Sequence, residues 1–157
     1  MRKRIINQTS QNRSSENQQW LDLEAIADVE VTSEDAAHPI ESALVLGTGS
    51  GWRAEQPGQQ TVRLLFYEPQ RIKRMNLVFH EIAHERTQQF VLRWSSDAGR
   101  SYREIVRQQY NFSPPDTTTE FEEFTVELEG LTTLELNIIP DISGGPACAS
   151  LNQLRLA

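Results

Sequence analysis

Apolar and polar residues alternate along much of this chain with a period of two, which is the period of a half-buried β-strand. The runs that show it lie at residues 62–66, 75–79, 90–94, 123–129 and 134–138, and the chain closes with the apolar residues Leu151, Leu154 and Leu156. Shorter runs at 28–31, 40–46 and 102–107 also favour strands, and a weakly helical or irregular lead-in is expected at 20–27. Segments rich in Gly, Pro, Asn and Ser separate the runs, as turns do.

Short strands with polar connections and no long helix predict an all-β protein, an antiparallel jelly-roll β-sandwich of about eight to nine strands. We expect a single sandwich domain over residues 20–157. Residues 1–19 are predicted to form a flexible polar tail, because they hold too few apolar side chains to build a core. The side chains expected in the core include Phe66, Leu77, Leu92, Trp94, Val126, Leu136, Ile138 and Leu154.

A long polar segment at residues 108–120 is predicted to be a loop. Its two aromatic residues, Tyr110 and Phe112, are candidates for an exposed contact patch or a dimer contact. By contrast, Trp52 is expected in the core, since large aromatic side chains dominate the interior of sandwiches.

Charge and composition exclude several kinds of partner. The net charge is −7 over 157 residues, which argues against nucleic acid or an anionic membrane surface as a partner, because both need a positive footprint. No apolar run has the roughly 18 residues of a membrane span. The basic start of the chain is not followed by an apolar stretch, and Cys148 has no second cysteine to pair with. These features predict a cytoplasmic protein.

The segment His80-Glu81-Ile82-Ala83-His84 matches the zinc-hydrolase pattern His-Glu-x-x-His. Zinc chemistry needs both imidazoles on one helix face, with the glutamate as general base. The pattern lies between two strand-like runs, and Glu85 to Gln89 offer no apolar helix face. A polar loop is therefore predicted, with no bound metal, no other cofactor and no enzymatic activity.

Several motifs occur together in one order. They are an early strand and Ser turn at 29–33, Gly51-Trp52 at 51–54, a Ser-x-Asp-x-Gly turn with a following aromatic at 95–102, and Ala-Ser-Leu-x-x-Leu-Arg at 149–155. In these motifs the chain resembles the discoidin, or coagulation factor 5/8 type C, family of galactose-binding domain-like jelly rolls. The resemblance implies a non-catalytic module for a carbohydrate-like or other polar ligand.

The resemblance also implies where a ligand binds. Family members bind at one end of the sandwich through three loops, which correspond here to residues 33–39, 47–51 and 80–86. All three histidines of the chain fall in these loops. The predicted ligand-binding residues are His38, Gly49, His80, Glu81, His84 and Arg86.

Many family members hold a structural calcium, and the chain departs from them at that place. The acidic positions that help bind it in the family read Val45 and Gln153 here. Calcium prefers several oxygen ligands that include carboxylates, so we expect none at this place.

Three hypotheses about function follow. The first is a binding module for a glycan or a small polar ligand, and the second is a cytoplasmic protein-protein interaction or self-association domain. The third, which lacks helical context, is a zinc-dependent hydrolase that uses His80, Glu81 and His84. Exposed aromatic residues beside the histidine loops would favour the first, an exposed apolar sheet face the second, and a helix at 78–90 the third.

Overall fold

The computed structural model describes residues 20–47 and 50–157, so the tail predicted at residues 1–19 lies outside the described residues. The two short helices of this part are α2 (Leu23–Ile26) and α3 (Glu41–Leu44). No helix among the described residues is long and apolar enough to cross a membrane. The rest of the described secondary structure consists of strands.

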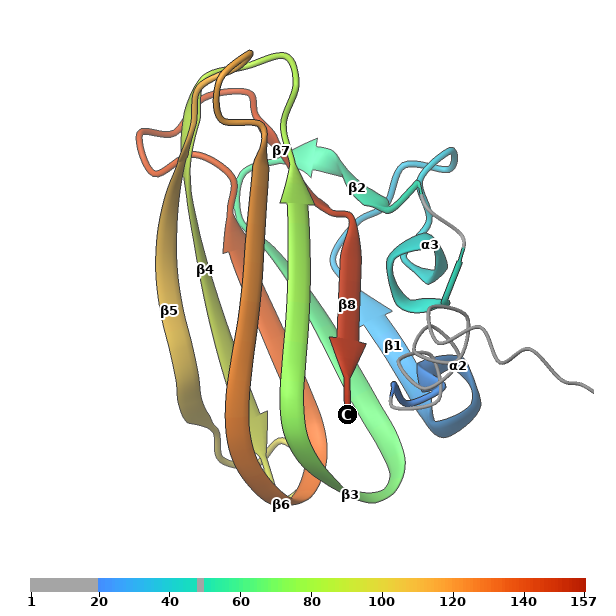
Figure 1. Ribbon diagram of the computed structural model, residues 1–157. Coiled ribbons are helices and arrows are strands. Elements are labelled where there is room, and N and C mark those ends of the chain that lie inside the picture. The colour runs from blue at the N-terminus through green and yellow to red at the C-terminus, as the bar shows by residue number, and fades with distance from the viewer. Residues whose placement is uncertain (1–19, 48–49) are drawn as a thin grey trace, which may run out of the picture.

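Eight strands occur in the described residues, and all of their pairings are antiparallel. They are β1 (Ala27–Val31), β2 (Trp52–Pro57), β3 (Gln60–His80), β4 (Arg86–Ser95), β5 (Arg103–Phe112), β6 (Thr119–Ile139), β7 (Cys148–Leu151) and β8 (Gln153–Leu156). The main sheet has the order β1-β3-β6-β4-β5, with β8 also paired to β3, and β2 and β7 form a separate two-stranded sheet. Figure 1 shows the arrangement.

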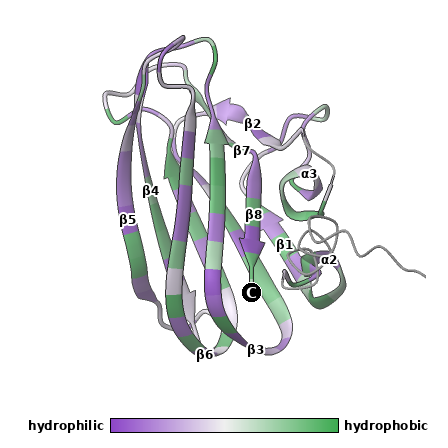
Figure 2. Cartoon of the chain, viewed as in Figure 1, coloured by the Kyte–Doolittle hydropathy of each residue, from purple (hydrophilic) through white to green (hydrophobic). Residues whose placement is uncertain are grey.

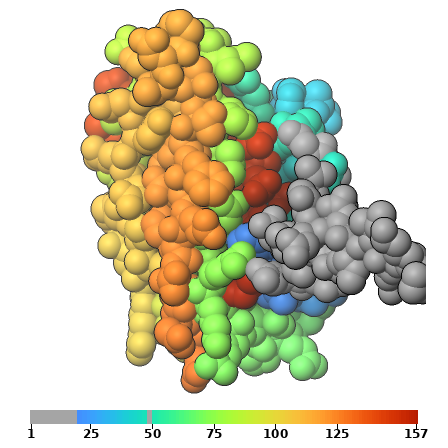
Figure 3. Space-filling model, viewed as in Figure 1, coloured from blue at the N-terminus to red at the C-terminus, as the bar shows by residue number. Residues whose placement is uncertain are grey.

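The two long strands β3 and β6 build both layers of the sandwich. They pair with each other along both halves. The register shifts between Leu65 and Arg74. In this region both ribbons bend from one layer into the other, at the lower end of Figure 1. The first half of β3 pairs with β1, and the second half of β6 pairs with β4. The second half of β3 pairs instead with β8. The surface on the viewer's side runs across β5, β6, β3 and β8 (Figure 3).

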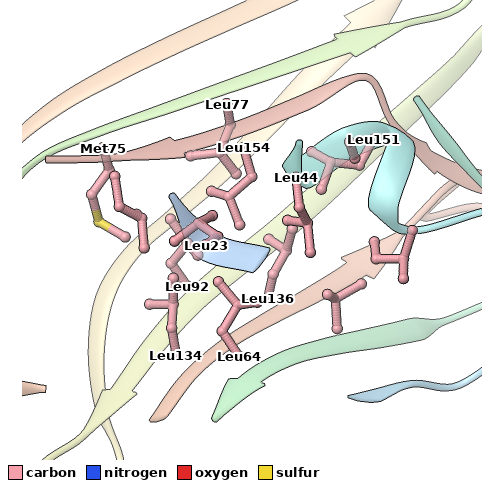
Figure 4. Close-up of a cluster of buried hydrophobic side chains, with 14 of the residues drawn as sticks. Leu23, Leu44, Leu64, Met75, Leu77, Leu92, Leu134, Leu136, Leu151 and Leu154 are labelled. Atoms are coloured by element: carbon pink, nitrogen blue, oxygen red, sulfur yellow. The ribbon is translucent and has the colours of Figure 1, made fainter. Parts of the chain in front are cut away.

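The strand register places apolar residues opposite one another inside the sandwich. Leu92 pairs with Leu136, which pairs with Val62, so one apolar row crosses three strands. Side chains from both layers and from α2 and α3 meet in the core, as Figure 4 shows for Leu23, Leu44 and Leu77. Figure 2 shows the same alternation of polar and apolar residues along the strands.

The predicted core is largely confirmed. Six of its members are buried, namely Phe66, Leu77, Leu92, Leu136, Ile138 and Leu154. Trp94 and Val126 are only partly buried and pack against the core from its margin. Trp52 is buried, as expected.

The strand predicted at residues 40–46 is wrong, because this segment contains α3. The buried residues Ile40, Ala43 and Leu44 have the i, i+3, i+4 spacing of one helix face. Over so short a run, this spacing also resembles an apolar strand segment. The helix packs against β8, which closes that side of the core.

The loop predicted at residues 108–120 is also wrong for most of its length. Strand β5 continues to Phe112 by pairing with β4, and β6 begins at Thr119. Phe112 is fully buried, and Tyr110 is half-buried with its hydroxyl donating to the Thr119 carbonyl oxygen at 2.8 Å. These aromatic residues therefore stabilise the fold and do not form an exposed patch.

Candidate functional site

The candidate site lies at the end of the sandwich that carries β2 and β7, at the top of Figure 1. Two backbone hydrogen bonds tie the 33–39 loop to β2, from Asp35 N to Arg53 O at 2.8 Å and from Arg53 N to His38 O at 3.2 Å. The loop between β3 and β4 begins at the same end, where His80 is the last residue of β3. Two neighbouring hollows open between these segments.

The first hollow, which we call the histidine cleft, has a volume of about 360 Å³. Trp52 and Leu151 line it and are buried, while Ile82, with an exposed fraction of 82%, adds an apolar surface. His38, Arg53 and His80 supply polar groups around them. The cleft therefore combines an apolar surface with several hydrogen-bonding side chains.

The second hollow, which we call the Arg86 hollow, has a volume of about 340 Å³. It shares Arg53, Glu81 and Cys148 with the histidine cleft, so the two hollows adjoin one another. Its other side carries His84, Glu85, Arg86 and Asp141. The structure thus gathers the predicted site residues into two neighbouring hollows, except Gly49, which lies outside the described residues.

Glu81 is held in place by its neighbours. Its Oε1 accepts a hydrogen bond from Arg86 Nε at 2.8 Å, and its Oε2 accepts from the backbone N–H groups of Ala83 and His84. Partial burial raises the pKa of Glu81, but these hydrogen bonds outweigh it and hold the pKa below its usual range. Glu81 is therefore an ionised and fully engaged side chain.

Arg86, which was predicted to bind a ligand, is the most enclosed of the predicted site residues that the structure describes. Its side chain is 1% exposed, and its NH1 donates to Gln88 Oε1 and to the Pro140 carbonyl oxygen. The guanidinium also lies 4.7 Å from the centre of the Phe112 ring. The enclosed guanidinium thus holds Glu81 in position, and direct contact between Arg86 and a ligand stays a prediction.

Both histidines of the histidine cleft are oriented through Nδ1. His38 Nδ1 lies 3.3 Å from Asp35 Oδ2, and His80 Nδ1 lies 2.9 Å from Thr119 Oγ1. The backbone N–H of Ala37 and the His38 ring lower the pKa of Asp35. Fixing Nδ1 in this way leaves Nε2 of each ring for an external partner.

The His-Glu-x-x-His segment does not lie on a helix. His80 ends β3, Glu81 to Glu85 form a loop, and β4 begins at Arg86. Within residues 20–47 and 50–157, no group of three His, Cys, Asp or Glu side chains could hold a metal ion. The i, i+4 helical geometry on which the zinc hypothesis depends is therefore absent from this segment.

The residues at the place of the family calcium do not fit that ion. The buried guanidinium of Arg155 donates to the carbonyl oxygens of Ala43 and Leu154, both at 3.0 Å, and to that of Val45 at 3.5 Å. Burial lowers the pKa of Arg155. Gln153 donates to Asn76 Oδ1 and offers no carboxylate. A fixed cation of the protein thus already engages the carbonyl oxygens of Ala43, Val45 and Leu154 at this place.

Arg53 was missed by the sequence analysis, although it lines both hollows. It directly follows Trp52, and strand alternation predicts the opposite orientation for two neighbouring residues. Trp52 is buried and Arg53 is exposed. The buried tryptophan was therefore a signal that the next side chain faces the surface.

Gly51 fixes the backbone at the edge of the histidine cleft. Its φ is +74°, and an added Cβ would lie 2.8 Å from both Asn152 Cα and the Leu151 carbonyl oxygen. We expect Gly51→Ala to destabilise the protein by about 1–3 kcal/mol. The alanine would have to adopt a strained left-handed backbone conformation, and its Cβ would clash with rigid backbone. Urea unfolding measures this, with Gly58→Ala as the control because its φ is similar, at +83°, but its added Cβ meets nothing within 4 Å. Equal losses in the two variants would show that the close approach at Gly51 contributes nothing.

Comparison with known proteins identifies the fold. No protein-family model matches the sequence, and neither does any curated protein sequence. A family 32 carbohydrate-binding module of Clostridium perfringens, solved with GalNAc-β-1,3-galactose, matches with a TM-score of 0.63 and 16% identity over 87% of this chain and 98% of that chain. The family 32 module of AlyQ, solved with 4,5-unsaturated mannuronic acid, has a TM-score of 0.60 and 15% identity over 84% and 95% of the two chains.

A third similar structure was solved with a protein partner. XRCC1 bound to the catalytic domain of DNA polymerase β matches with a TM-score of 0.58 and 14% identity, over 82% of this chain and 92% of that chain. Identities this low establish the fold alone. The chain has the antiparallel jelly-roll fold of galactose-binding-like, discoidin-type domains, which confirms the fold predicted from its sequence.

Proposed function

We propose that this protein is a non-catalytic carbohydrate-binding module and that the histidine cleft is its binding site. The observation that carries the proposal is the lining of the cleft, where the exposed Ile82 lies beside the polar side chains of His38, Arg53 and His80. A sugar ring presents both C–H faces and hydroxyl groups, and a site of this mixed kind can satisfy both. Similar structures include modules solved with sugar ligands.

An exposed aromatic residue close to the cleft further supports a glycan ligand. Thr119 pairs with His80 and Phe121 pairs with Val78, so Phe121 and His80 are diagonal neighbours on the outer face of the sheet. Phe121 is 61% exposed. Its ring is available to a sugar unit that extends beyond the cleft.

The chemistry of the cleft favours binding over catalysis. Hydrolysis of a glycosidic bond ordinarily needs two carboxyl groups, one of which is held protonated as an acid. Glu81 is the one acidic residue in the described lining of the cleft, and its pKa is held below the usual range. A single engaged carboxylate supplies neither the proton donor nor a second carboxylate.

The alternative is a protein-protein interaction domain, and the outer face of β3 and β6 favours it. The exposed Phe121 and the half-buried Val78 form an apolar pair there. The similar structure of XRCC1 with DNA polymerase β shows that this fold is compatible with a protein ligand. This second function would place the contact on the sheet face and leave the cleft free.

Chemical-shift mapping with a panel of oligosaccharides tests the proposal. We expect perturbed signals from His38, Arg53, His80 and Ile82, and at least about tenfold weaker binding by a His38→Ala/His80→Ala variant, because each lost hydrogen bond costs about 1 kcal/mol. Arg100→Gln is the control and should bind normally, because Arg100 is exposed in the connection between β4 and β5, at the opposite end of the sandwich. Perturbations confined to Phe121 and Val78, or unchanged binding by the double variant, would contradict the proposed site.

A further inference from the structure

We propose that the histidine cleft is selective for acidic sugars and that Arg53 binds the carboxylate of a uronic acid. This inference rests on the proposed function and adds a ligand class and a specificity-determining residue to it. The inference depends on whether the positive charge of Arg53 has a direct partner among the side chains around the cleft.

Arg53 is the cation available to a ligand. Its side chain is exposed, and its guanidinium makes no hydrogen bond or ion pair with residues 20–47 or 50–157. Asp35 is an acidic group close enough to interact with Arg53 through space, but its Oδ1 accepts from Ala37 N and its Oδ2 contacts the His38 ring. Arg53 therefore has no direct side-chain partner among the described residues, and the ionised Asp35 is only a through-space neighbour of its guanidinium.

The acidic group within the cleft does not offset this charge. Glu81 lines the cleft, but its Oε1 is paired with Arg86 and its Oε2 accepts two backbone hydrogen bonds. Two further acidic residues, Glu85 and Asp141, line the adjoining Arg86 hollow, and Asp141 Oδ1 accepts hydrogen bonds from the backbone N–H and the hydroxyl of Ser143. In the described lining of the histidine cleft, Arg53 is thus the one Arg or Lys side chain that an anionic ligand group can meet, and His38 and His80 line the same cleft.

A uronic acid satisfies this arrangement better than a neutral hexose. Its carboxylate can accept two parallel hydrogen bonds from a guanidinium, and such charge-assisted bonds are about twice as strong as those to a neutral hydroxyl. The Nε2 atoms of His38 and His80 remain for the ring hydroxyls, and Ile82 for a C–H face. Because Arg53 is exposed to solvent, salt should weaken the carboxylate contact.

The test compares matched sugar pairs by NMR titration, namely oligomers of galacturonate with galactose, glucuronate with glucose, and mannuronate with mannose. We expect at least one acidic member to bind about tenfold more tightly than its neutral partner, and the preference to shrink as salt is added. Arg53→Gln should remove the preference while retaining the weaker binding of the neutral sugar. Arg100→Gln makes the same charge change at the opposite end and should leave the preference intact.

The possible failures are distinguishable. Binding of neutral sugars as tightly as acidic ones, or an acidic preference that survives Arg53→Gln, would overturn this inference and leave the proposed function standing. Absence of binding to every member of the panel would overturn both. A preference lost equally in Arg53→Gln and Arg100→Gln would show that only net charge acts, which also overturns the role of Arg53.

Discussion

Replacing Arg86 with methionine is expected to lower the free energy of unfolding by about 3–5 kcal/mol, because it leaves a partly buried carboxylate without its cation. The Arg86 side chain is 1% exposed and pairs with Glu81 at 2.8 Å. The substitution also removes the donors to Gln88 Oε1 and the Pro140 carbonyl oxygen. Urea unfolding followed by tryptophan fluorescence measures the loss.

An exposed ion pair of the same length provides the control for Arg86. Arg107 pairs with Glu104 at 2.8 Å, but the two side chains are 49% and 46% exposed. Arg107→Met should cost less than about 1 kcal/mol, because solvent screens exposed pairs. A Glu81→Gln/Arg86→Met variant should recover part of the loss, since no unpaired charge remains. Equal costs for Arg86→Met and Arg107→Met would contradict the role given to burial.

Replacing Glu120 with glutamine is expected to stabilise the protein by up to about 4 kcal/mol at pH 8, because each unit of pKa shift corresponds to about 1.4 kcal/mol. Glu120 is 1% exposed, and within the described structure its Oε2 accepts no hydrogen bond. Burial, together with the nearby Glu122 carboxylate, raises its pKa from 4.5 to about 8. Its Oε1 accepts from Gln88 Nε2 at 3.0 Å, a bond that the amide oxygen of glutamine can retain.

The direction of the pH dependence follows from the raised pKa. Below pH 4.5 the carboxyl group of Glu120 is protonated in both the folded and the unfolded chain. As the pH rises from 4.5 to about 8, the unfolded chain loses this proton while the folded chain keeps it, so the free energy of unfolding falls. Above about pH 8 the penalty is constant. The stabilisation by Glu120→Gln should therefore be near zero at pH 4.5 and largest at pH 8.

Glu123→Gln is the matched control, because Glu123 lies on the same strand with an exposed side chain. It should change stability by less than about 0.5 kcal/mol at either pH. Chemical denaturation at pH 4.5 and pH 8 separates the two variants. A destabilised Glu120→Gln protein at pH 8 would show that the folded chain prefers the ionised carboxylate.

The period of the apolar residues was sufficient to predict the fold class. Each of Leu134, Leu136 and Ile138 is buried as its place in the alternation predicts. This works because successive side chains of a strand point to opposite faces, whichever strands lie beside it. The order of short motifs added the jelly-roll arrangement, which the structure confirms.

Two segments were misread because their periodic signal is too short or too polar. In α3, Ile40, Ala43 and Leu44 form only one helical face of a single turn. In the second half of β5, Gln108 and Asn111 are polar, and the strand is recognisable only through its pairing with β4. Long-range pairing thus decided the secondary structure where the local pattern was ambiguous.

The candidate site, like the fold, was predicted from the sequence only in part. The sequence, through the resemblance, predicted that the loops of His38 and His80 meet at one end, and the structure places both residues in one cleft. Whether that cleft binds a ligand stays a prediction. The sequence did not reveal that Arg53 lines the same cleft, or that the Arg86 side chain is enclosed.

The sequence by itself determined which residues alternate between core and surface, and therefore the class of fold. Only the tertiary structure decided which polar residues are buried together, as Arg86, Gln88 and Glu120 are. Gln88 and Glu120 are 32 residues apart in the chain, and they meet although the pairing of β4 with β6 joins other positions of these strands. Local periodicity is a property of each strand, whereas the environment of a polar group depends on every strand and loop packed against it.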